Sequence, residues 1–279
     1  NSIQGVSSVS EADCIVAFDG TSNKASPVTS KDQKVILVQR EPDHIYPFIT
    51  HFSVDKVFGY KSSEYPPHCR WGLDYNYDEL KDLKYPDNKA KNQAACIMSN
   101  KDFTAGMKLR LDFLFRLCQT YPDAVDLYSS TLSKEKFGTS HKGGVPHLDR
   151  ISTLKISSTN NGINSLSCQS GALYPYEKCV SIENGKLPNF LTRTTEAVLC
   201  WTLPMYWGCP NIGDFFKGGY RWLDIEDPST ACEQFMEFMN EPITDAVIEE
   251  LSVARNKVLD EYNVWAITEK MVLDVMEKC

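Results

Sequence analysis

Short apolar runs separated by longer polar stretches mark the first part of the chain. Residues 14–18 (CIVAF), 34–39 (KVILVQ) and 54–60 (VDKVFGY) are rich in valine, isoleucine and phenylalanine. Runs of this length and composition are typical of buried strands in a parallel sheet. The first part of the chain is therefore predicted to contain short parallel strands.

Strands and helices alternate after a polar, proline-containing stretch at 84–93. Residues 94–100 (AACIMSN) predict a strand, and 107–121 predict an amphipathic helix because leucine and phenylalanine recur on one helical face. Residues 124–128 (AVDLY) predict the next strand. A strand, a helix and a strand at this spacing form a βαβ unit.

The same order recurs in the second half of the chain. The predicted elements there are strand 178–182, helix 194–202, strand 204–208, helix 229–240 and two helices within 244–279. This alternation predicts an α/β fold of two doubly wound halves, which bind ligands beyond the carboxyl ends of their strands. We expect an N-terminal unit at 1–92, a second unit at 93–260, and a C-terminal helix at 261–279 that can cross back to the first unit.

Composition limits the class of partner. A formal net charge of -8 argues against a nucleic-acid binder, because phosphate contacts normally require a basic face. The N-terminal stretch lacks the pattern of a signal peptide, and no apolar run is long enough for a membrane span. The ten cysteines are scattered and include no C-x-x-C pair, which favours buried thiols over disulfides and argues against zinc.

Cationic side chains gather at two predicted strand-to-helix turns. Arg193 stands at the start of the helix in the second half, and Lys101, Lys108 and Arg110 surround the turn before the earlier helix. A helix N-terminus attracts anions through its free N–H groups and its dipole. If the two turns face one ligand, their cations converge on one diphosphate. The alternative is that these residues are solvated surface charges.

A motif between Tyr174 and Phe216 is more specific. It resembles the donor-binding motif of the α1,3-fucosyltransferase family, which contains Glu-Asn, Thr-Glu-Lys and Pro-x-Tyr-Trp-Gly-x-Pro segments in this order. The residues in register are Glu183, Asn184, Thr195, Glu196, Pro204, Tyr206, Trp207, Gly208 and Pro210. Weaker similarities to the same family lie at 36–45, 54–73 and 97–117. The resemblance implies a GT-B fold, with two Rossmann-like domains facing across a cleft, and an inverting glycosyltransferase that moves a sugar from a nucleotide donor to a glycan hydroxyl.

One position departs from the family pattern. Ala197 stands where the family has the lysine of Thr-Glu-Lys, which is expected to neutralise the donor phosphates. This departure weakens the expectation of the family's usual donor, GDP-fucose, although Arg193 can supply the charge from another direction as a guanidinium fork. The chain also resembles glycosyltransferases of large algal DNA viruses. That resemblance favours UDP-xylose as donor, a viral capsid glycan as acceptor and the cytoplasm of an infected host cell as location.

The reaction requires a base for the acceptor hydroxyl and cations or dipoles for the leaving diphosphate. Glu41 is the predicted base, because it follows an apolar strand and matches the family's glutamate position, with Asp43 and His44 on the acceptor side as alternatives. The residues expected to bind the donor are Arg110, Glu183, Asn184, Arg193, Thr195, Glu196, Lys108 and Tyr206.

Several of these roles have alternatives. Glu196 is expected at the ribose hydroxyls or, equally, as a carboxylate stabilised by the helix dipole. Tyr206 and Trp207 favour core packing over sugar stacking, and the polar groups of Glu183 and Asn184 would find partners in a nucleotide-sugar or in loop backbone. No Asp-x-Asp motif occurs, so we expect no metal and no cofactor other than the nucleotide-sugar co-substrate, with arginine and lysine neutralising the phosphates instead.

Two rival functions belong to other classes. A non-catalytic carbohydrate-binding protein on a degenerate transferase fold would account for Ala197, but the retained Glu183, Asn184, Thr195, Glu196 and Arg110 argue against it. A phosphorylase or epimerase of the same two-domain architecture is the second, and fold alone does not assign function.

Overall fold

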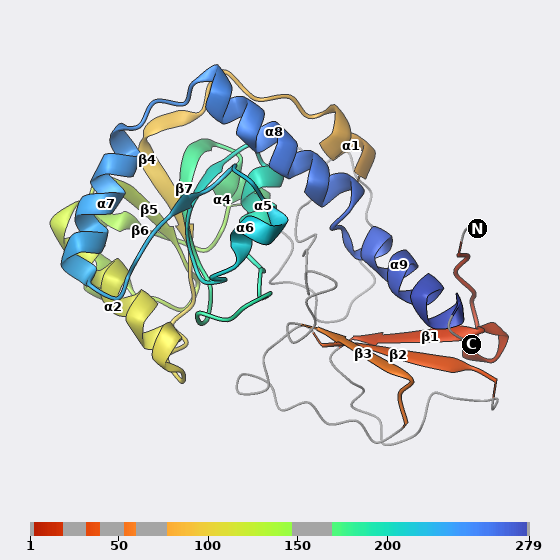
Figure 1. Ribbon diagram of the computed structural model, residues 1–279. Helices are drawn as coiled ribbons and strands as arrows, with labels where there is room; N and C mark the ends of the chain where they lie inside the picture. Colours follow the sequence, from red (N-terminus) through yellow and green to blue (C-terminus); the bar gives the residue numbers. More distant parts are fainter. Residues whose placement is uncertain (1–2, 19–31, 40–52, 60–76, 147–168, 278–279) are drawn as a thin grey trace.

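The computed structural model describes residues 3–18, 32–39, 53–59, 77–146 and 169–277. It contains two parallel β-sheets with helices against them (Figure 1). The α/β, GT-B-like class predicted from the sequence is confirmed in these terms, including the helices at the C-terminal end. No helix in the described ranges is long and apolar enough to cross a membrane.

The smaller sheet has three strands in the order β1-β2-β3. Its strands are β1 (Cys14–Phe18), β2 (Lys34–Gln39) and β3 (Lys56–Gly59). All pairings are parallel, and β2 lies in the centre, so its apolar side chains are buried. These strands confirm the three apolar runs as strands.

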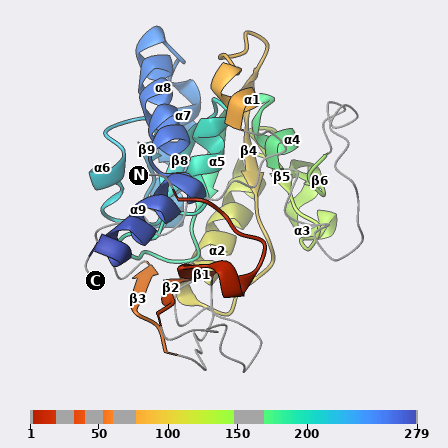
Figure 2. The same cartoon turned by 90° about the vertical axis from the view of Figure 1, so that its right-hand side faces the viewer.

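The last helix, α9 (Val264–Glu277), covers one face of this small sheet, and both views place it beside the three strands (Figures 1 and 2). Six buried side chains form the shared core: Ile36, Val38, Phe58, Ile267, Met271 and Val275. The last three recur at helical spacing along α9 and form its apolar stripe. The C-terminal helix therefore belongs to the core of the N-terminal strands.

The larger sheet has six strands in the order β6-β5-β4-β7-β8-β9, all of them parallel. Its strands are β4 (Ala90–Ile97), β5 (Val125–Tyr128), β6 (His141–Gly143), β7 (Tyr176–Ile182), β8 (Leu203–Trp207) and β9 (Arg221–Trp222). The chain builds the sheet outward from β4 in one direction and then outward from β7 in the other. The order therefore reverses between β4 and β7, as in a doubly wound nucleotide-binding sheet.

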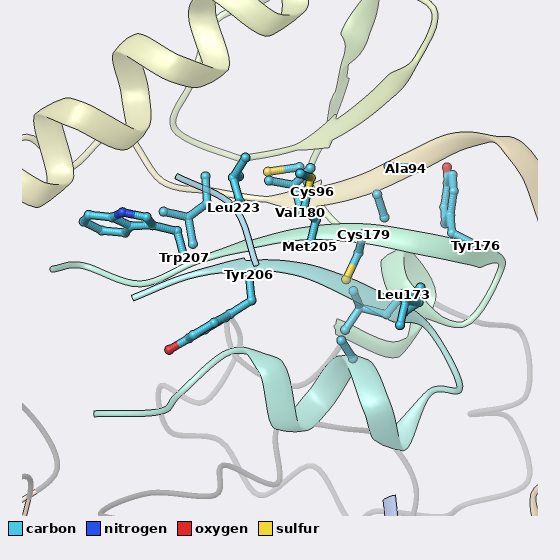
Figure 3. Close-up of a cluster of buried hydrophobic side chains, with 14 of the residues drawn as sticks. Ala94, Cys96, Leu173, Tyr176, Cys179, Val180, Met205, Tyr206, Trp207 and Leu223 are labelled. Carbon is cyan, nitrogen blue, oxygen red and sulfur yellow. The ribbon is translucent and has the colours of Figure 1, made fainter. Parts of the chain in front are cut away.

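Helices cover both faces of the larger sheet. The helices of the described ranges are α1 (Tyr77–Asp82), α2 (Ala105–Thr120), α3 (Lys134–Phe137), α4 (Gln169–Leu173), α5 (Thr194–Leu199), α6 (Ile212–Phe215), α7 (Pro228–Asn240) and α8 (Asp245–Asp260), with 3-10 turns at Val9–Glu11 and Gly138–Ser140. Helices α2 and α7 pack together, while α5 packs on α4 and α8. Figure 3 shows Tyr206 and Trp207 of β8 pointing to different sides, so this central strand is covered on both faces.

Buried cations at the amino edge of the larger sheet cap the C-terminus of helix α5. The Lys89 ammonium donates to the backbone oxygens of Tyr176 and Cys200 at 2.8 and 2.9 Å, and Arg255 donates to Leu199 O at 3.2 Å. The bond from Lys89 to Cys200 O and the bond from Arg255 to Leu199 O satisfy backbone carbonyls at the end of α5. A cation at a helix C-terminus is favoured by the helix dipole. These contacts fix the far end of the helix whose first turn lies at the candidate site.

The sequence predictions hold for the strands at 14–18, 34–39, 124–128, 178–182 and 204–208 and for the longer helices. Two bounds differ. Strand β4 begins at Ala90, inside the stretch expected to be a polar connection, because Lys91 and Asn92 lie exposed at the sheet margin while Ala94 and Cys96 are buried. Helix α5 ends at Leu199, because Trp201 adopts a left-handed backbone with φ 56°.

The division of the chain into units at 1–92, 93–260 and 261–279 stays a prediction. Its first boundary would fall inside β4. The cysteines of the described ranges are free thiols, most of them buried, as predicted.

Candidate functional site

The carboxyl ends of β4 and β7 form the point where the strand order of the larger sheet reverses. A cavity of about 20 Å³ lies there, lined by Ile97, Gln169, Leu173, Cys179, Val180, Ser181, Arg193 and Ala197. Open α/β sheets bind ligands at this reversal point. The cavity therefore marks the candidate site, and Arg193 is a predicted site residue in its wall.

Arg110 reaches this edge from α2. Its side chain is fully buried, and Nη1 donates to Asn184 Oδ1 at 2.5 Å while Nη2 donates to Lys101 O at 3.5 Å. The Nε–H has no hydrogen-bond partner among the described residues. Burial, followed by repulsion from Arg193, lowers the pKa of Arg110 to about 10. A buried cation with an unpaired donor is costly, so this group is suited to an anionic ligand.

Arg193 reaches the same edge from the loop before α5. Its Nη1 donates to Ile97 O, the last carbonyl of β4, at 3.3 Å. The charge of Arg193 also contributes, after burial, to the lowered pKa of Arg110. Neither forms an ion pair within the described ranges. The structure thus brings together Arg110, Arg193 and Asn184, three of the residues predicted to bind the donor.

Glu183 holds the loop that carries Arg193. Its carboxylate is fully buried and accepts from the backbone N–H groups of Thr192 and Arg193 at 2.7 and 3.1 Å, and from the Thr192 hydroxyl at 2.5 Å. The sequence left open whether Glu183 finds its partners in a nucleotide-sugar or in loop backbone, and in this structure the backbone of the loop supplies them. Glu183 therefore positions Arg193 in this structure, and a direct contact of Glu183 with a donor stays a prediction.

Tyr206 and Gly208 support that carboxylate from β8. Burial and the Glu183 charge raise the pKa of the Tyr206 hydroxyl well above its ordinary value, and this hydroxyl also accepts from Cys209 N–H at 2.8 Å. At Gly208 (φ 154°) a Cβ atom would lie 2.4 Å from Glu183 Cγ. The Tyr-x-Gly part of the motif is thus packed around Glu183, and Tyr206 itself lies in the core, as the sequence favoured.

The first turn of α5 contributes buried polar groups. Thr195 is fully buried and its hydroxyl has no hydrogen-bond partner in the part of the chain that the structure describes, while Glu196 is 1% exposed. Ala197, the position that departs from the family pattern, lines the cavity beside Arg193. The unpaired Thr195 hydroxyl is a second donor without a partner in the same region, after Arg110 Nε–H.

Two loops from opposite sides of the reversal point are tied to each other. Thr104, the N-cap of α2, donates from its hydroxyl to Asn184 O at 3.2 Å. A Cβ atom at Gly106 would lie 2.5 Å from that same oxygen, so the backbone of α2 packs directly on the chain after β7. Only glycine permits so close an approach of one backbone to another.

Other predicted residues lie elsewhere. Lys108 is exposed on α2, away from the buried Arg110. Glu41, Asp43 and His44 lie outside the described residues. In the part of the chain that the structure describes, no three His, Cys, Asp or Glu side chains are grouped to hold a metal, and metal independence stays a prediction.

Some residues at this edge could not be identified from the sequence. Thr192 gives two hydrogen bonds to Glu183, yet it lies in a loop without any catalytic pattern. Gln169 and Ser181 line the cavity, and Ser181 was hidden inside an apolar strand. A polar residue near the end of a buried strand was the one available signal for Ser181.

Comparisons with known proteins give structural similarity alone. No family model and no curated protein sequence matches the chain. Among solved structures, an α1,3-fucosyltransferase with GDP-fucose is 12% identical, with 91% of this chain and 80% of that chain covered and a TM-score of 0.41. The N-terminal domain of Candida albicans trehalose-6-phosphate phosphatase is 13% identical over 67% of this chain and 42% of that chain, with a TM-score of 0.44. The GtfA/B complex is 13% identical over 70% and 38%, with a TM-score of 0.41. Identities and TM-scores this low do not extend the likeness to a substrate.

Proposed function

We propose that the chain is an inverting glycosyltransferase that moves a sugar from a nucleoside-diphosphate donor to a glycan hydroxyl. The observation that carries the proposal is the pair Arg110 and Arg193, whose guanidiniums contact Asn184 after β7 and the last carbonyl of β4, without a carboxylate partner in the described ranges. Two fixed cations at the reversal point of a doubly wound sheet match the charge and the place of a diphosphate.

In the proposed reaction, the site stabilises the negative charge that develops on the leaving diphosphate. As the bond between the sugar and the diphosphate breaks, negative charge grows on the leaving phosphate oxygens, and fixed guanidinium N–H groups stabilise that charge without reorganising. Arg110 Nε–H and the Thr195 hydroxyl are both buried without partners and would donate to the same oxygens. Asn184 Oδ1 holds the Arg110 fork in place, and Glu183 holds the backbone of Arg193.

Glu41 is the proposed general base, with Asp43 or His44 in its place as alternatives. Support comes from its position two residues beyond Gln39, where the central strand of the smaller sheet ends, and from the family resemblance. A carboxylate there would take the proton of the attacking hydroxyl.

UDP-xylose is the proposed donor, and GDP-fucose is the alternative. Ala197 in the cavity wall replaces the family's lysine, so the contacts to the diphosphate fall to Arg193 and Arg110. The viral resemblance adds the proposed setting, which is synthesis of a capsid glycan in the cytoplasm of an infected cell. The proposed reaction uses no metal, so transfer should survive chelation by EDTA.

Calorimetric titration of the purified chain with UDP, GDP and their sugar conjugates tests the proposal. Arg110→Ala and Arg193→Ala should each weaken binding of the bound nucleotide by about tenfold or more, equal to about 1.4 kcal/mol. Arg116→Ala is the matched control, because Arg116 is exposed on the same helix. Unchanged affinity in both site variants would contradict the proposal. Binding of free sugars but of no nucleotide would favour a carbohydrate-binding protein.

A further inference from the structure

An asparagine followed by glycine lies next to Arg110 in the candidate site. Asn184 and Gly185 form a bend directly after β7, and both are partly exposed. The side-chain oxygen of Asn184 accepts from Arg110, whereas its Nδ2 makes no hydrogen bond within the described ranges. The backbone N–H of Gly185 has no partner there either.

Asn184 and Gly185 together supply the reacting groups of spontaneous deamidation. The Gly185 nitrogen is the nucleophile, Asn184 Cγ is the electrophile, and Nδ2 is the leaving group. Glycine is the residue that hinders the nucleophile least, and no atom lies within 4 Å of the place where a Cβ of Gly185 would be. Solvent water is the other reactant, and both residues are accessible to it.

Arg110 makes the side-chain amide of Asn184 more electrophilic. Its Nη1 lies 2.5 Å from Asn184 Oδ1, so the guanidinium withdraws electron density from Cγ. When the nitrogen attacks, negative charge develops on Oδ1, and a fixed cation at that oxygen stabilises it. The contact that positions Arg110 for a phosphate therefore also activates the amide.

We propose that Asn184 is a deamidation site and that its product inactivates the candidate site. The Gly185 nitrogen loses its proton and bonds to Cγ, the Cγ–Nδ2 bond breaks, and ammonia leaves. Water then opens the resulting succinimide to aspartate or isoaspartate. The net change is one water consumed and one ammonia released, with no oxidation or reduction.

The effect of this deamidation on ligand binding rests on the proposed function. A carboxylate at position 184 faces the Arg110 guanidinium at hydrogen-bond distance and forms an ion pair with it. The ion pair neutralises one of the two cations proposed to hold the diphosphate. The chain would thus lose nucleotide affinity with age at a rate set by its own sequence.

Peptide mapping by mass spectrometry during incubation at mildly alkaline pH tests the modification itself. The native chain should convert the peptide that contains 184 and 185 at a rate within about tenfold of the urea-denatured chain, a difference of at most about 1.4 kcal/mol in activation free energy. Gly185→Ala should slow the conversion by about tenfold or more, by the same relation. This variant has room for its methyl group and needs no positive φ. The chain's other Asn-Gly pair, 161–162, gives an internal comparison.

An amide that persists in the native chain while the denatured chain loses it would overturn the proposal. The functional half is tested by titrating aged wild type, aged Gly185→Ala and fresh Asn184→Asp with UDP and GDP. Relative to fresh wild type, affinity should fall about tenfold or more, about 1.4 kcal/mol, in aged wild type and in Asn184→Asp. Aged Gly185→Ala should keep whatever affinity fresh Gly185→Ala has. Undiminished affinity in Asn184→Asp would overturn the inactivation. If fresh wild type binds neither nucleotide, the proposed function fails, whereas the mass measurement still decides the modification.

Discussion

Glu183 sets the position of Arg193 through the backbone that joins them. Its carboxylate takes hydrogen bonds from Thr192 and Arg193, and Tyr206 lies against it. A buried carboxylate that accepts this many bonds is held rigidly, and removal of its charge leaves buried donors without acceptors. The residue therefore acts on a ligand through Arg193.

Glu183→Gln should destabilise the fold and weaken nucleotide binding together. The glutamine amide group would turn N–H donors toward N–H donors of the loop, and each unsatisfied buried group costs about 1–3 kcal/mol. Urea unfolding and calorimetric titration give the two quantities. Glu226→Gln is the control, because that side chain is 57% exposed in its ion pair with Lys186, and such pairs contribute about 1 kcal/mol or less. Equal unfolding free energies for Glu183→Gln and wild type would contradict the assignment.

At the level of single residues, the sequence indicated which positions gather but not where their side chains point. The motif identified Glu183, Asn184 and Tyr206, and the structure brings them together near Arg110 and Arg193. The inward direction of Glu183 depends on Thr192 and on the φ of Gly208. Both are set by loop conformation, which has no periodic signal in sequence.

At the level of elements, helix α2 is joined to the chain after β7 through its first turn. Gly106→Ala should lower stability, although alanine favours a helix by about 1 kcal/mol over glycine. The added methyl group would lie 2.5 Å from Asn184 O and 2.8 Å from Gly185 Cα, so backbone must shift. Thermal or urea unfolding measures the effect. Gly213→Ala in α6 is the control, because its nearest atom would be 3.8 Å away. A gain in stability at Gly106 would show that the two loops separate easily.

The C-terminus of α5 has a pH-dependent cap. Burial lowers the pKa of Lys89 from 10.5 to about 7. Between these values the unfolded chain keeps a proton that the folded chain has released, so the free energy of unfolding rises with pH, by at most about 1.4 kcal/mol per pH unit. Lys89→Met should lose this slope.

Urea unfolding of both proteins between about pH 7 and pH 9.5 measures the difference. Other titrating groups, among them the buried thiol of Cys179 nearby, are common to both proteins, so their contributions to the pH dependence largely cancel. Parallel curves for wild type and Lys89→Met would show that Lys89 keeps its charge when folded.

The buried strands and the longer helices could be predicted from the sequence, whereas several short helices could not. Runs such as 35–38 and 204–207 are continuously apolar because the strands are covered on both faces. Helices α1 and α4 have six and five residues, too few to show a period or to be stable alone. Packing against α8 and β4 stabilises them, and that information lies far away in the sequence.

At the level of the whole molecule, the two ends of the chain share one core. Ile267→Ala should destabilise the small sheet by about 2–5 kcal/mol, since Ile267 is buried against the strands of the N-terminal part. Trp265→Ala on the same helix should change stability by less than about 0.5 kcal/mol, because that side chain is 80% exposed. Hydrogen exchange should become faster in β1–β3 while β7 and β8 keep their protection. Equal acceleration in both sheets would mean that the molecule unfolds as one unit.

The proposed mechanism assigns different roles to residues at the two sheets. The larger sheet carries Arg110 and Arg193 at the end of β4 and β7, whereas Glu41 follows β2 of the smaller sheet. If Glu41 is the base, Glu41→Gln should leave donor affinity nearly intact and lower the transfer rate by roughly 100- to 10,000-fold, because the isosteric amide cannot accept the hydroxyl proton. If Arg193 binds the diphosphate as proposed, Arg193→Ala should instead lower affinity and rate together, since it would remove a charge that acts before and during bond cleavage. Calorimetric titration and single-turnover kinetics separate the two signatures. Loss of donor binding in Glu41→Gln would assign this residue a structural role, and near-wild-type transfer would move the base to Asp43 or His44.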